Sequence, residues 1–213
     1  IMARISFAST VEEAIAGADF IQETIVEKKD AKEELYAKLA ACVPADVIIA
    51  SNTSALNIFE VVPEQLLPQM IICHWYAPPH VIPLVEVVKS ESAPQEYADI
   101  AVTMLNNCGK TAVLMKKFIR GYIVNRLQQC LNQEVFYLLD NGYCDAEAID
   151  LAAKASFIPR ACVLGLCKRM DFGGVDMTFN NFKSFLIVAH FDFQCFKRTI
   201  FFCSCNKIFT KIF

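Results

Sequence analysis

The stretch MIICHWYAPPHVIPLVEVV, Met70 to Val88, decides the fold of this sequence. Two apolar runs, MIIC and LVEVV, lie on either side of two adjacent prolines, and each is typical of a short buried strand. His74 follows the first run, and Glu86 lies inside the second. An isolated ionised carboxylate is strongly disfavoured in an apolar environment. Glu86 therefore needs a partner, and a nearby imidazole would be one.

Short apolar runs alternate with helical stretches on both sides of this segment. We predict a strand and its exit at residues 19–27 (DFIQETIVE), and strands at 47–50 (VIIA), 70–76 (MIICHWY), 84–88 (LVEVV) and 111–116 (TAVLMK). We predict helices at residues 93–109 and at 31–43, the latter with apolar Leu35, Leu39 and Ala40 on one side. Strands that alternate with helices predict an α/β layer with a largely parallel sheet.

Polar clusters follow three of the predicted strands. QETIVE, SNTS and HWYAPP each begin where an apolar run ends. In an open parallel sheet, ligands bind beyond the carboxyl ends of the strands. We therefore expect these three clusters to converge on one crevice.

The sequence after Arg120 is helical in character. GYIVNRLQQCLNQEVFYLLDNGY (121–143) carries apolar residues close to a helical period, and Asn141-Gly142 is a good stop signal. Asp145 is a suitable cap for a second helix, AEAIDLAAKA (146–155). A second, helical domain is predicted to begin in this region.

The segment 179–213 differs from the rest of the chain. It holds ten of the seventeen phenylalanines and a single acidic residue, Asp192, and no convincing period runs through it. One interpretation is a Phe-rich basic helix that packs on the core or on a partner. The other, which we favour, is a non-native reading frame, because Phe, Lys, Ile and Asn are encoded by AT-rich codons.

Composition excludes several classes of protein. Although 55% of the residues are apolar, no uninterrupted apolar run approaches the roughly 18 to 20 residues that span a bilayer. The first residues lack the pattern of a secretory signal. We expect a soluble, cytoplasmic protein, with a mitochondrial or peroxisomal location left open. The net charge of -3 argues against nucleic acid as a partner.

The ten cysteines are scattered, mostly inside apolar stretches and without CxxC pairs. We interpret them as reduced, buried thiols that act as small hydrophobic side chains. The spacing of His190, Cys195, Cys203 and Cys205 fits no common zinc pattern, so we predict no metal site.

Four residues form the chemical hypothesis. If the strand that ends at His74 lies beside the strand that holds Glu86, the carboxylate can accept a hydrogen bond from one imidazole nitrogen and raise its basicity. The other nitrogen is then free to take a proton from a substrate hydroxyl. Ser54 would hydrogen-bond to the same oxygen, and Asn125 could reach the crevice from the second domain. The alternative is a satisfied core pair of histidine and glutamate without a catalytic role.

SNTSAL, HWYAPPHVIPLVEVV and GYIVNRL, in this order and at these intervals, resemble the 3-hydroxyacyl-CoA dehydrogenase family. That family includes dehydrogenases of free 3-hydroxy acids such as gulonate and carnitine. The resemblance extends from about Ile5 to Met177. It implies an α/β partial Rossmann-type domain over residues 1–118 and an all-α C-terminal domain over 119–178, followed by the atypical tail at 179–213. It also implies NAD as cofactor, oxidation of a 3-hydroxyl to a ketone, and a homodimer formed through the helical domain.

The resemblance assigns roles to individual residues. His74 matches the catalytic base, Glu86 its orienting carboxylate, Ser54 the hydroxyl near substrate and nicotinamide, and Asn125 the active-site asparagine. Glu27 and Lys32, in IVEKKDAKEEL, match positions that touch the cofactor together with Ser54.

Two features depart from the family pattern. Ala77 stands where the family usually has an asparagine near the cofactor, and no GxGxxG can be built from the seven glycines. That glycine-rich loop binds the pyrophosphate through its backbone amides and the helix behind it. Together with the Ile1 start, this leads us to expect an incomplete chain that is inactive alone and has an uncovered sheet edge.

Two functions are therefore compared. The first is an NAD-dependent dehydrogenase of a 3-hydroxyacyl-CoA or a free 3-hydroxy acid, with a small-molecule substrate and no membrane or nucleic-acid partner. The second is a non-catalytic remnant, or a structural relative that keeps only the dimerisation region.

Overall fold

The computed structural model describes residues 4–174 and 176. The chain divides into two compact units, of which the first ends at Asn132 and the second begins at Gln133. The first unit contains the sheet, and the second is helical in the part that the structure describes.

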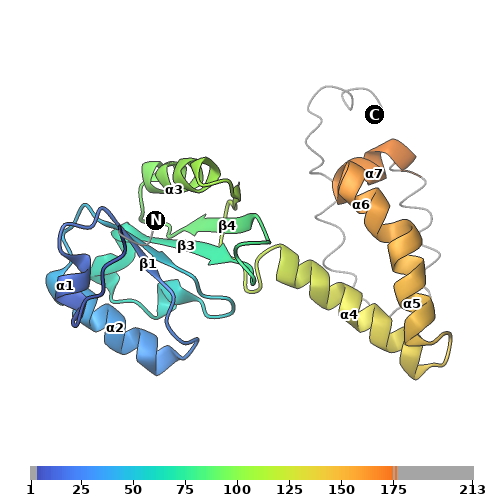
Figure 1. Cartoon of the computed structure of the whole chain (residues 1–213), viewed down its shortest axis with the longest axis horizontal. Coiled ribbons are helices and arrows are strands. Elements are labelled where there is room, and N and C mark those ends of the chain that lie inside the picture. Colours follow the sequence, from blue (N-terminus) through green and yellow to red (C-terminus); the bar gives the residue numbers. More distant parts are fainter. Residues whose placement is uncertain (1–3, 175, 177–213) are drawn as a thin grey trace. The chain divides into compact units, whose positions relative to one another are not determined.

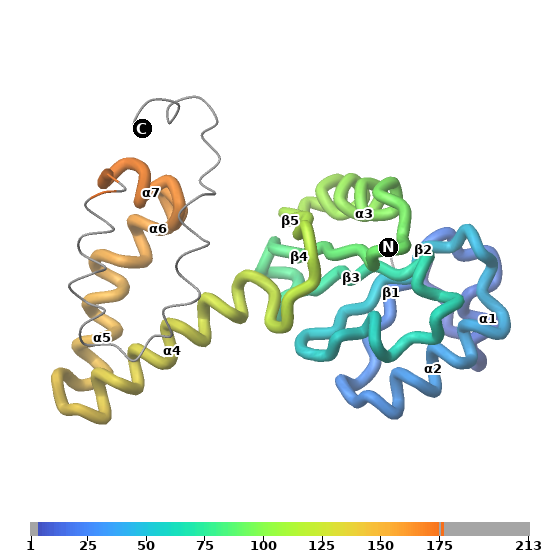
Figure 2. The backbone as a smooth tube through the Cα atoms, turned by 180° about the vertical axis from the view of Figure 1, so that it is seen from behind, coloured from blue at the N-terminus to red at the C-terminus, as the bar shows by residue number. Residues whose placement is uncertain are grey.

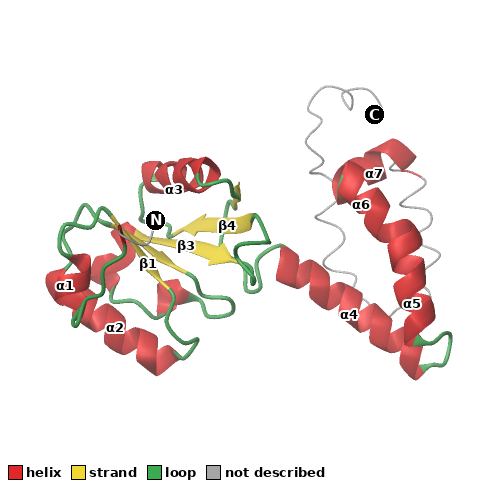
Figure 3. Cartoon of the chain, viewed as in Figure 1, coloured by secondary structure: helices red, strands yellow, loops and turns green. Residues whose placement is uncertain are grey.

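A five-stranded sheet forms the first unit, and its strands follow one another in chain order (Figures 1 and 3). The pairs β1–β2, β2–β3 and β4–β5 are parallel, whereas β3 and β4 are antiparallel. The predicted largely parallel sheet is confirmed. The strands are β1 (Phe20–Glu23), β2 (Ile48–Ser51), β3 (Met70–Trp75), β4 (Leu84–Lys89) and β5 (Thr111–Leu114).

Helices cover both faces of this sheet, with α2 on one side and α3 on the other (Figures 1 and 2). Successive side chains of a strand point to opposite faces, so one strand contributes to both cores. The helical elements of this unit are α1 (Val11–Ile15), α2 (Lys29–Cys42), the 3-10 helices η2 (Ile58–Glu60) and η3 (Glu64–Gln69), and α3 (Gln95–Asn107).

The two cores differ in what they contain. On the α3 side, Ala98, Ala101 and Leu105 recur at a helical period and pack over Cys73 and Val85 in an apolar layer. On the α2 side, the apolar layer of Ile49 and Ile72 continues into polar groups: Lys32, Ser51, His74 and Glu86 are all buried. The functional site therefore lies on the α2 face of the sheet.

The helical region follows the predicted stop and cap signals. α4 ends at Asp140, and Gly142 adopts a positive φ of 67°, which favours glycine. The Asp145 carboxylate caps the next helix by accepting from the Ala148 amide at 2.8 Å. The elements here are α4 (Val124–Asp140), α5 (Ala146–Ala152), the π-helical turn η4 (Ala153–Phe157), α6 (Ile158–Leu164) and α7 (Leu166–Gly173).

Some expectations about composition are corrected or fall outside the described chain. Among the described cysteines, Cys73 is buried, but five are exposed, so the prediction of buried thiols is wrong for these: Cys42, Cys108, Cys130, Cys162 and Cys167. In the helical region the apolar neighbours Leu131, Val163 and Leu166 are exposed as well, so an apolar stretch there does not imply burial. The tail at 179–213, with His190 and its last three cysteines, lies outside the described residues. No helix in the described part is long and apolar enough to cross a bilayer.

Candidate active site

His74 and Glu86 are brought together by the antiparallel pairing of β3 and β4. The two residues are direct partners in the register of these strands. The imidazole Nδ1 lies 3.1 Å from the carboxylate Oε2. Both residues are buried, at 2% and 0% exposure. The hypothesis that these two strands are neighbours is confirmed.

The Glu86 carboxylate is surrounded by four hydrogen-bond donors. Oε2 accepts from the Tyr76 hydroxyl at 2.7 Å as well as from His74. Oε1 accepts from the backbone amides of Ile123 at 2.9 Å and Val124 at 3.1 Å. Burial alone would raise the pKa of Glu86, but these hydrogen bonds outweigh it and hold the pKa below its usual value. The buried carboxylate is therefore ionised at neutral pH.

The imidazole of His74 is held between two aromatic rings. Tyr122 stacks on it with a centroid distance of 4.4 Å and an interplanar angle of 27°. Tyr76 meets it edge-on at 4.6 Å and 61°. An ionised Glu86 at Nδ1 favours the tautomer in which Nδ1 carries the proton, because a carboxylate only accepts hydrogen bonds. The remaining nitrogen, Nε2, is then the basic one.

Tyr122 connects this dyad to the loop that follows β2. Its side chain is fully buried, and its hydroxyl donates to the Thr53 carbonyl at 2.6 Å. Its backbone adopts a positive φ of 48°, which is uncommon for an aromatic residue. The segment before α4 therefore turns sharply to place this ring against His74.

Glu27 anchors the same loop. Its Oε1 accepts from the Thr53 hydroxyl at 2.6 Å and from the amides of Ser54, Ala55 and Leu56 at 2.9, 2.9 and 3.2 Å. Burial opposes ionisation, but the Thr53 hydroxyl, the Ala55 and Leu56 amides and the charge of Lys32 outweigh it and lower the pKa of Glu27 to about 2. The ionised Glu27 carboxylate thus binds four donors of the loop that presents Ser54.

Lys32 joins Glu27 to a second, deeper carboxylate. The Lys32 ammonium lies 2.8 Å from both oxygens of Glu23 and 3.4 Å from Oε2 of Glu27. Tyr36 and Ser51 also donate to Glu23, at 3.0 and 2.6 Å. Lys32 itself is only 1% exposed. A network of ionic hydrogen bonds therefore runs beneath the Ser54 loop.

The three predicted polar clusters do converge. The Trp75 amide donates to Asn52 Oδ1 at 2.8 Å, and the Trp75 indole donates to Gln22 Oε1 at 3.3 Å. These bonds link HWYAPP to SNTS and to QETIVE, while Glu27 bonds directly to the Ser54 amide. The ends of β1, β2 and β3 therefore form one polar edge.

The remaining predicted residues lie at this edge. Ser54 is exposed on its loop, and Asn125 is partly buried in the first turn of α4, next to the amides that bind Glu86. Burial and the Glu86 carboxylate raise the pKa of Tyr76, and the Asn125 backbone opposes that rise. Asn125 is thus close to the dyad on the side of the Tyr76 hydroxyl.

Sequence reasoning missed three residues of this site: Glu23, Tyr76 and Tyr122. Glu23 belongs to the QETIVE cluster and ends β1, so the rule that ligands bind at strand ends could have marked it. The two tyrosines stand inside the motifs HWYAPP and GYIVNRL, where we interpreted only the neighbouring polar residues. Their hydroxyls were the overlooked signal, because a buried tyrosine usually hydrogen-bonds.

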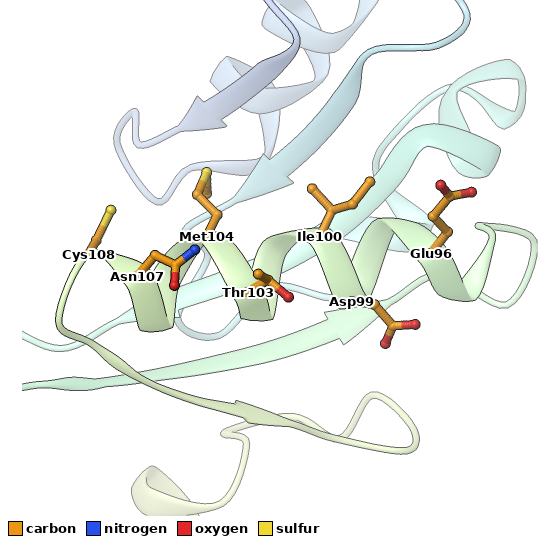
Figure 4. A pocket seen from close by; sticks show the side chains of 7 residues that line it. All are labelled: Glu96, Asp99, Ile100, Thr103, Met104, Asn107 and Cys108. Carbon is orange, nitrogen blue, oxygen red and sulfur yellow. The ribbon is translucent and has the colours of Figure 1, made fainter.

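Two surface hollows accompany the first unit. One, of about 580 Å³, lies along the outer face of α3, where Ile100 and Met104 alternate with polar residues (Figure 4). It includes none of the site residues above. The other, of about 510 Å³, adjoins the Ser54 loop through Leu56 and also includes Lys29 and Arg120.

Comparison with protein families matches both parts of the chain. Residues 1–118 match the 3-hydroxyacyl-CoA dehydrogenase NAD binding domain, and residues 121–197 match the C-terminal domain of the same family.

Named relatives agree with this match. L-carnitine dehydrogenase from Streptomyces griseus subsp. griseus is 37% identical over 148 residues, which cover 69% of this chain and 44% of that protein. 5-formyl-3-hydroxy-2-methylpyridine 4-carboxylate 5-dehydrogenase from Mesorhizobium japonicum is 30% identical over 184 residues, which cover 85% and 59%. The chain thus spans about half the length of the curated relatives it matches.

A solved structure of 5-formyl-3-hydroxy-2-methylpyridine 4-carboxylic acid 5-dehydrogenase, described as an NAD+ dependent dismutase, has the same arrangement of elements. It superposes with a TM-score of 0.77 at 26% identity, and the match covers 87% of this chain and 61% of that one. On the strength of both domain matches, this chain belongs to the 3-hydroxyacyl-CoA dehydrogenase family.

Proposed function

We propose that the protein oxidises the 3-hydroxyl of a 3-hydroxy acid, or of its CoA ester, to a ketone, with His74 as the general base. The observation that carries this proposal is the fully buried, ionised Glu86 hydrogen-bonded to Nδ1 of His74. A histidine paired in this way presents a basic Nε2 to a substrate hydroxyl. Glu23 is also buried and has several donors, so the imidazole partner of Glu86, and not the number of donors, is what supports a role in proton transfer.

NAD is the proposed oxidant, and when bound it accepts the hydride from the carbon that bears the hydroxyl. Glu27 and Ser54 would hold it, because they lie beyond the carboxyl ends of the parallel strands β1 and β2. An exposed hydroxyl and a partly exposed carboxylate suit the hydroxyl and amide groups of a nucleotide cofactor. Lys32 is buried, so we assign it the role of holding Glu27 from inside the protein.

In the proposed mechanism, Nε2 of His74 takes the proton of the substrate 3-hydroxyl. Glu86 stabilises the imidazolium that forms, and its bond to Nδ1 keeps the ring oriented. Ser54 donates a hydrogen bond to the substrate oxygen as charge develops there. Asn125, beside the dyad in α4, is proposed to orient the substrate from the opposite side.

Substrate class is the next part of the proposal. The two relatives above are named for L-carnitine and for a pyridine carboxylate, and neither name contains a CoA ester. The segment PPHVIPLVEVV is also similar to free-acid members of the family. We therefore propose a free 3-hydroxy acid as the first substrate to test, with a 3-hydroxyacyl-CoA as the comparison.

We also propose that the helical region forms a homodimer. Large apolar side chains are exposed on its described helices, among them Phe136, Leu151, Val163 and Phe172. Exposed apolar surface of this kind often marks a protein interface. Light scattering coupled to size-exclusion chromatography should give twice the 23.9 kDa mass of the chain, and a single-chain mass would contradict the dimer.

The second candidate function is a non-catalytic relative, which Ala77 favours because it replaces a side chain near the cofactor. An NADH fluorescence titration combined with an oxidation assay separates the two. For the enzyme we expect saturable binding and turnover that falls about 100-fold or more in His74→Ala. Binding without turnover in the wild-type chain, under all substrates tested, would favour the non-catalytic relative.

A further inference from the structure

The hydroxyl of Tyr76 binds the same carboxylate oxygen as the imidazole of His74. It donates to Glu86 Oε2 at 2.7 Å, whereas Nδ1 of His74 lies 3.1 Å from that atom. We propose that Tyr76 is a positioning residue of the dyad, which competes with His74 for Oε2 and so sets how strongly Glu86 draws a proton onto the imidazole. This inference rests on the proposed function of His74.

The geometry supports competition rather than simple packing. A carboxylate offers about four lone-pair sites, and all four donors of Glu86 are protein groups. The Tyr76 bond has the short length typical of a hydroxyl that donates to an ionised carboxylate. Each donor withdraws negative charge from the carboxylate. Because Tyr76 shares Oε2 with His74, its donation weakens the attraction between that oxygen and the ring.

The ring of Tyr76 has a second effect on the imidazole. It lies edge-on to His74, while Tyr122 covers the face of the ring. The two tyrosines together restrict rotation of the imidazole about its side-chain bonds. Loss of the Tyr76 hydroxyl alone would leave this steric effect intact, so the hydrogen bond and the packing can be tested separately.

The groups that face His74 come from three elements. Glu86 comes from β4, Tyr76 from the loop after β3, and Tyr122 from the segment before α4. Glu27 does not contact His74, but its negative charge helps to raise the pKa of Tyr122, which stacks on the imidazole. Of these, Tyr76 is the neutral donor that a one-atom substitution removes from Glu86.

The experiment measures the titration of Glu86 in the whole chain by carbon-13 NMR of its carboxyl group, assigned with Glu86→Gln. In Tyr76→Phe we expect the titration of Glu86 to move to higher pH, because one of the hydrogen bonds that lower its pKa is gone. The control is Tyr137→Phe, which removes a tyrosine hydroxyl from α4. In this variant Glu86 should titrate as in the wild type. If Glu86 titrates at the same pH in Tyr76→Phe as in the wild type, the proposal is overturned.

A second variant keeps the test decisive if Tyr76→Phe does not fold. Fluorotyrosine at position 76 has a more acidic hydroxyl and donates a stronger hydrogen bond, so the titration of Glu86 should move to lower pH. A shift in the same direction as that expected for Tyr76→Phe, or no shift, would overturn the proposal. Opposite shifts from the two substitutions would establish the hydrogen bond as the cause.

Activity gives an independent readout. In Tyr76→Phe the acidic limb of the pH profile for oxidation should move to higher pH, because a less satisfied Glu86 holds the proton on His74 more strongly. The KM for the acid substrate should stay near the wild-type value. If Glu86 titrates as expected but no substrate is oxidised, the proposed function fails, and only the hydrogen bond from Tyr76 to Glu86 stands. If turnover depends on His74 but the titration of Glu86 does not move in Tyr76→Phe, the role of Tyr76 is overturned and the proposed function is not.

Discussion

Two buried carboxylates on the same face of the sheet are neutralised in different ways. Glu23 and Glu86 are 3% and 0% exposed, and each accepts several hydrogen bonds. Glu23 is paired with the ammonium of Lys32, 2.8 Å away. Glu86 is paired with an imidazole, a side chain that can both accept and release a proton. The first arrangement is suited to holding structure, and the second to moving a proton.

Both carboxylates also accept hydrogen bonds from neutral donors. Tyr76 and the amides of Ile123 and Val124 still solvate Glu86 when His74 is neutral. Glu23 likewise accepts from the Ile25 amide and from the hydroxyls of Tyr36 and Ser51. The two carboxylates therefore differ in their charged partner: Lys32 lies 2.8 Å from both oxygens of Glu23, whereas His74 contacts only Oε2 of Glu86.

Removal of the Lys32 charge should have the largest effect on stability. Lys32→Met leaves Glu23 buried without its cation, which typically costs about 3 to 5 kcal/mol of the free energy of unfolding. Urea denaturation measures this loss. The matched control is Lys38→Met on the exposed side of α2, where the pair with Glu34 should contribute about 0.5 kcal/mol or less. Equal losses for both variants would contradict the comparison.

Neutralisation of the other carboxylate should act on catalysis rather than on folding. Glu86→Gln keeps the size of the side chain but removes the charge that stabilises the imidazolium of His74, so kcat should fall about 100-fold or more while KM changes little. Steady-state kinetics with NAD and a 3-hydroxy acid measure both constants. Glu91→Gln, an exposed position on the loop after β4, serves as the control. Wild-type turnover in Glu86→Gln would remove the dyad from the mechanism.

The contribution of Glu27 to stability should change only in acid and should be constant around neutral pH. The pKa of Glu27 is lowered to about 2 from an ordinary value of 4.5, so the unfolded state binds the proton first as the pH falls. Its contribution to stability is therefore complete above pH 4.5 and is lost as the pH falls toward 2, by about 1 to 2 kcal/mol because a third of the side chain is exposed. Unfolding at several pH values should show a flatter acid limb for Glu27→Gln. An unchanged slope would contradict this anchor.

The strands were predictable because their sequences carry unbroken apolar runs. MIIC and LVEVV contribute side chains to the cores on both faces of the sheet. A strand that is buried on both faces has an almost continuous apolar sequence, which can be recognised in a single chain. The pairing of His74 with Glu86 followed from treating a carboxylate in such a run as a group that needs a partner. In both cases the physical constraint is local to one segment.

The charged interior was harder to predict for a physical reason. The apolar side of the 31–43 helix was predicted from Leu35, Leu39 and Ala40, but the fully buried positions of α2 are Lys32, Tyr36 and Leu39. A lysine normally lies outside, and only its pairing with Glu23 on β1 makes its burial tolerable. Likewise, the contact of the Ile123 amide with Glu86 joins residues 37 positions apart. Such contacts depend on the path of the whole chain, which no local pattern encodes.

The smallest predicted effect tests whether the loop bound by Glu27 and the His74–Glu86 dyad depend on each other. The Tyr122 hydroxyl donates to the Thr53 carbonyl, and its ring stacks on His74, so this residue joins the Glu27 loop to the dyad. Tyr122→Phe removes one neutral hydrogen bond and keeps the stacked ring, which should cost about 1 kcal/mol of stability and leave kcat close to that of the wild type. Urea denaturation and steady-state kinetics measure the two quantities, with the exposed Tyr143→Phe as the control. A fall in kcat as steep as that of Glu86→Gln would mean that the loop positions the base through this hydroxyl, and the loop and the dyad would then act as one.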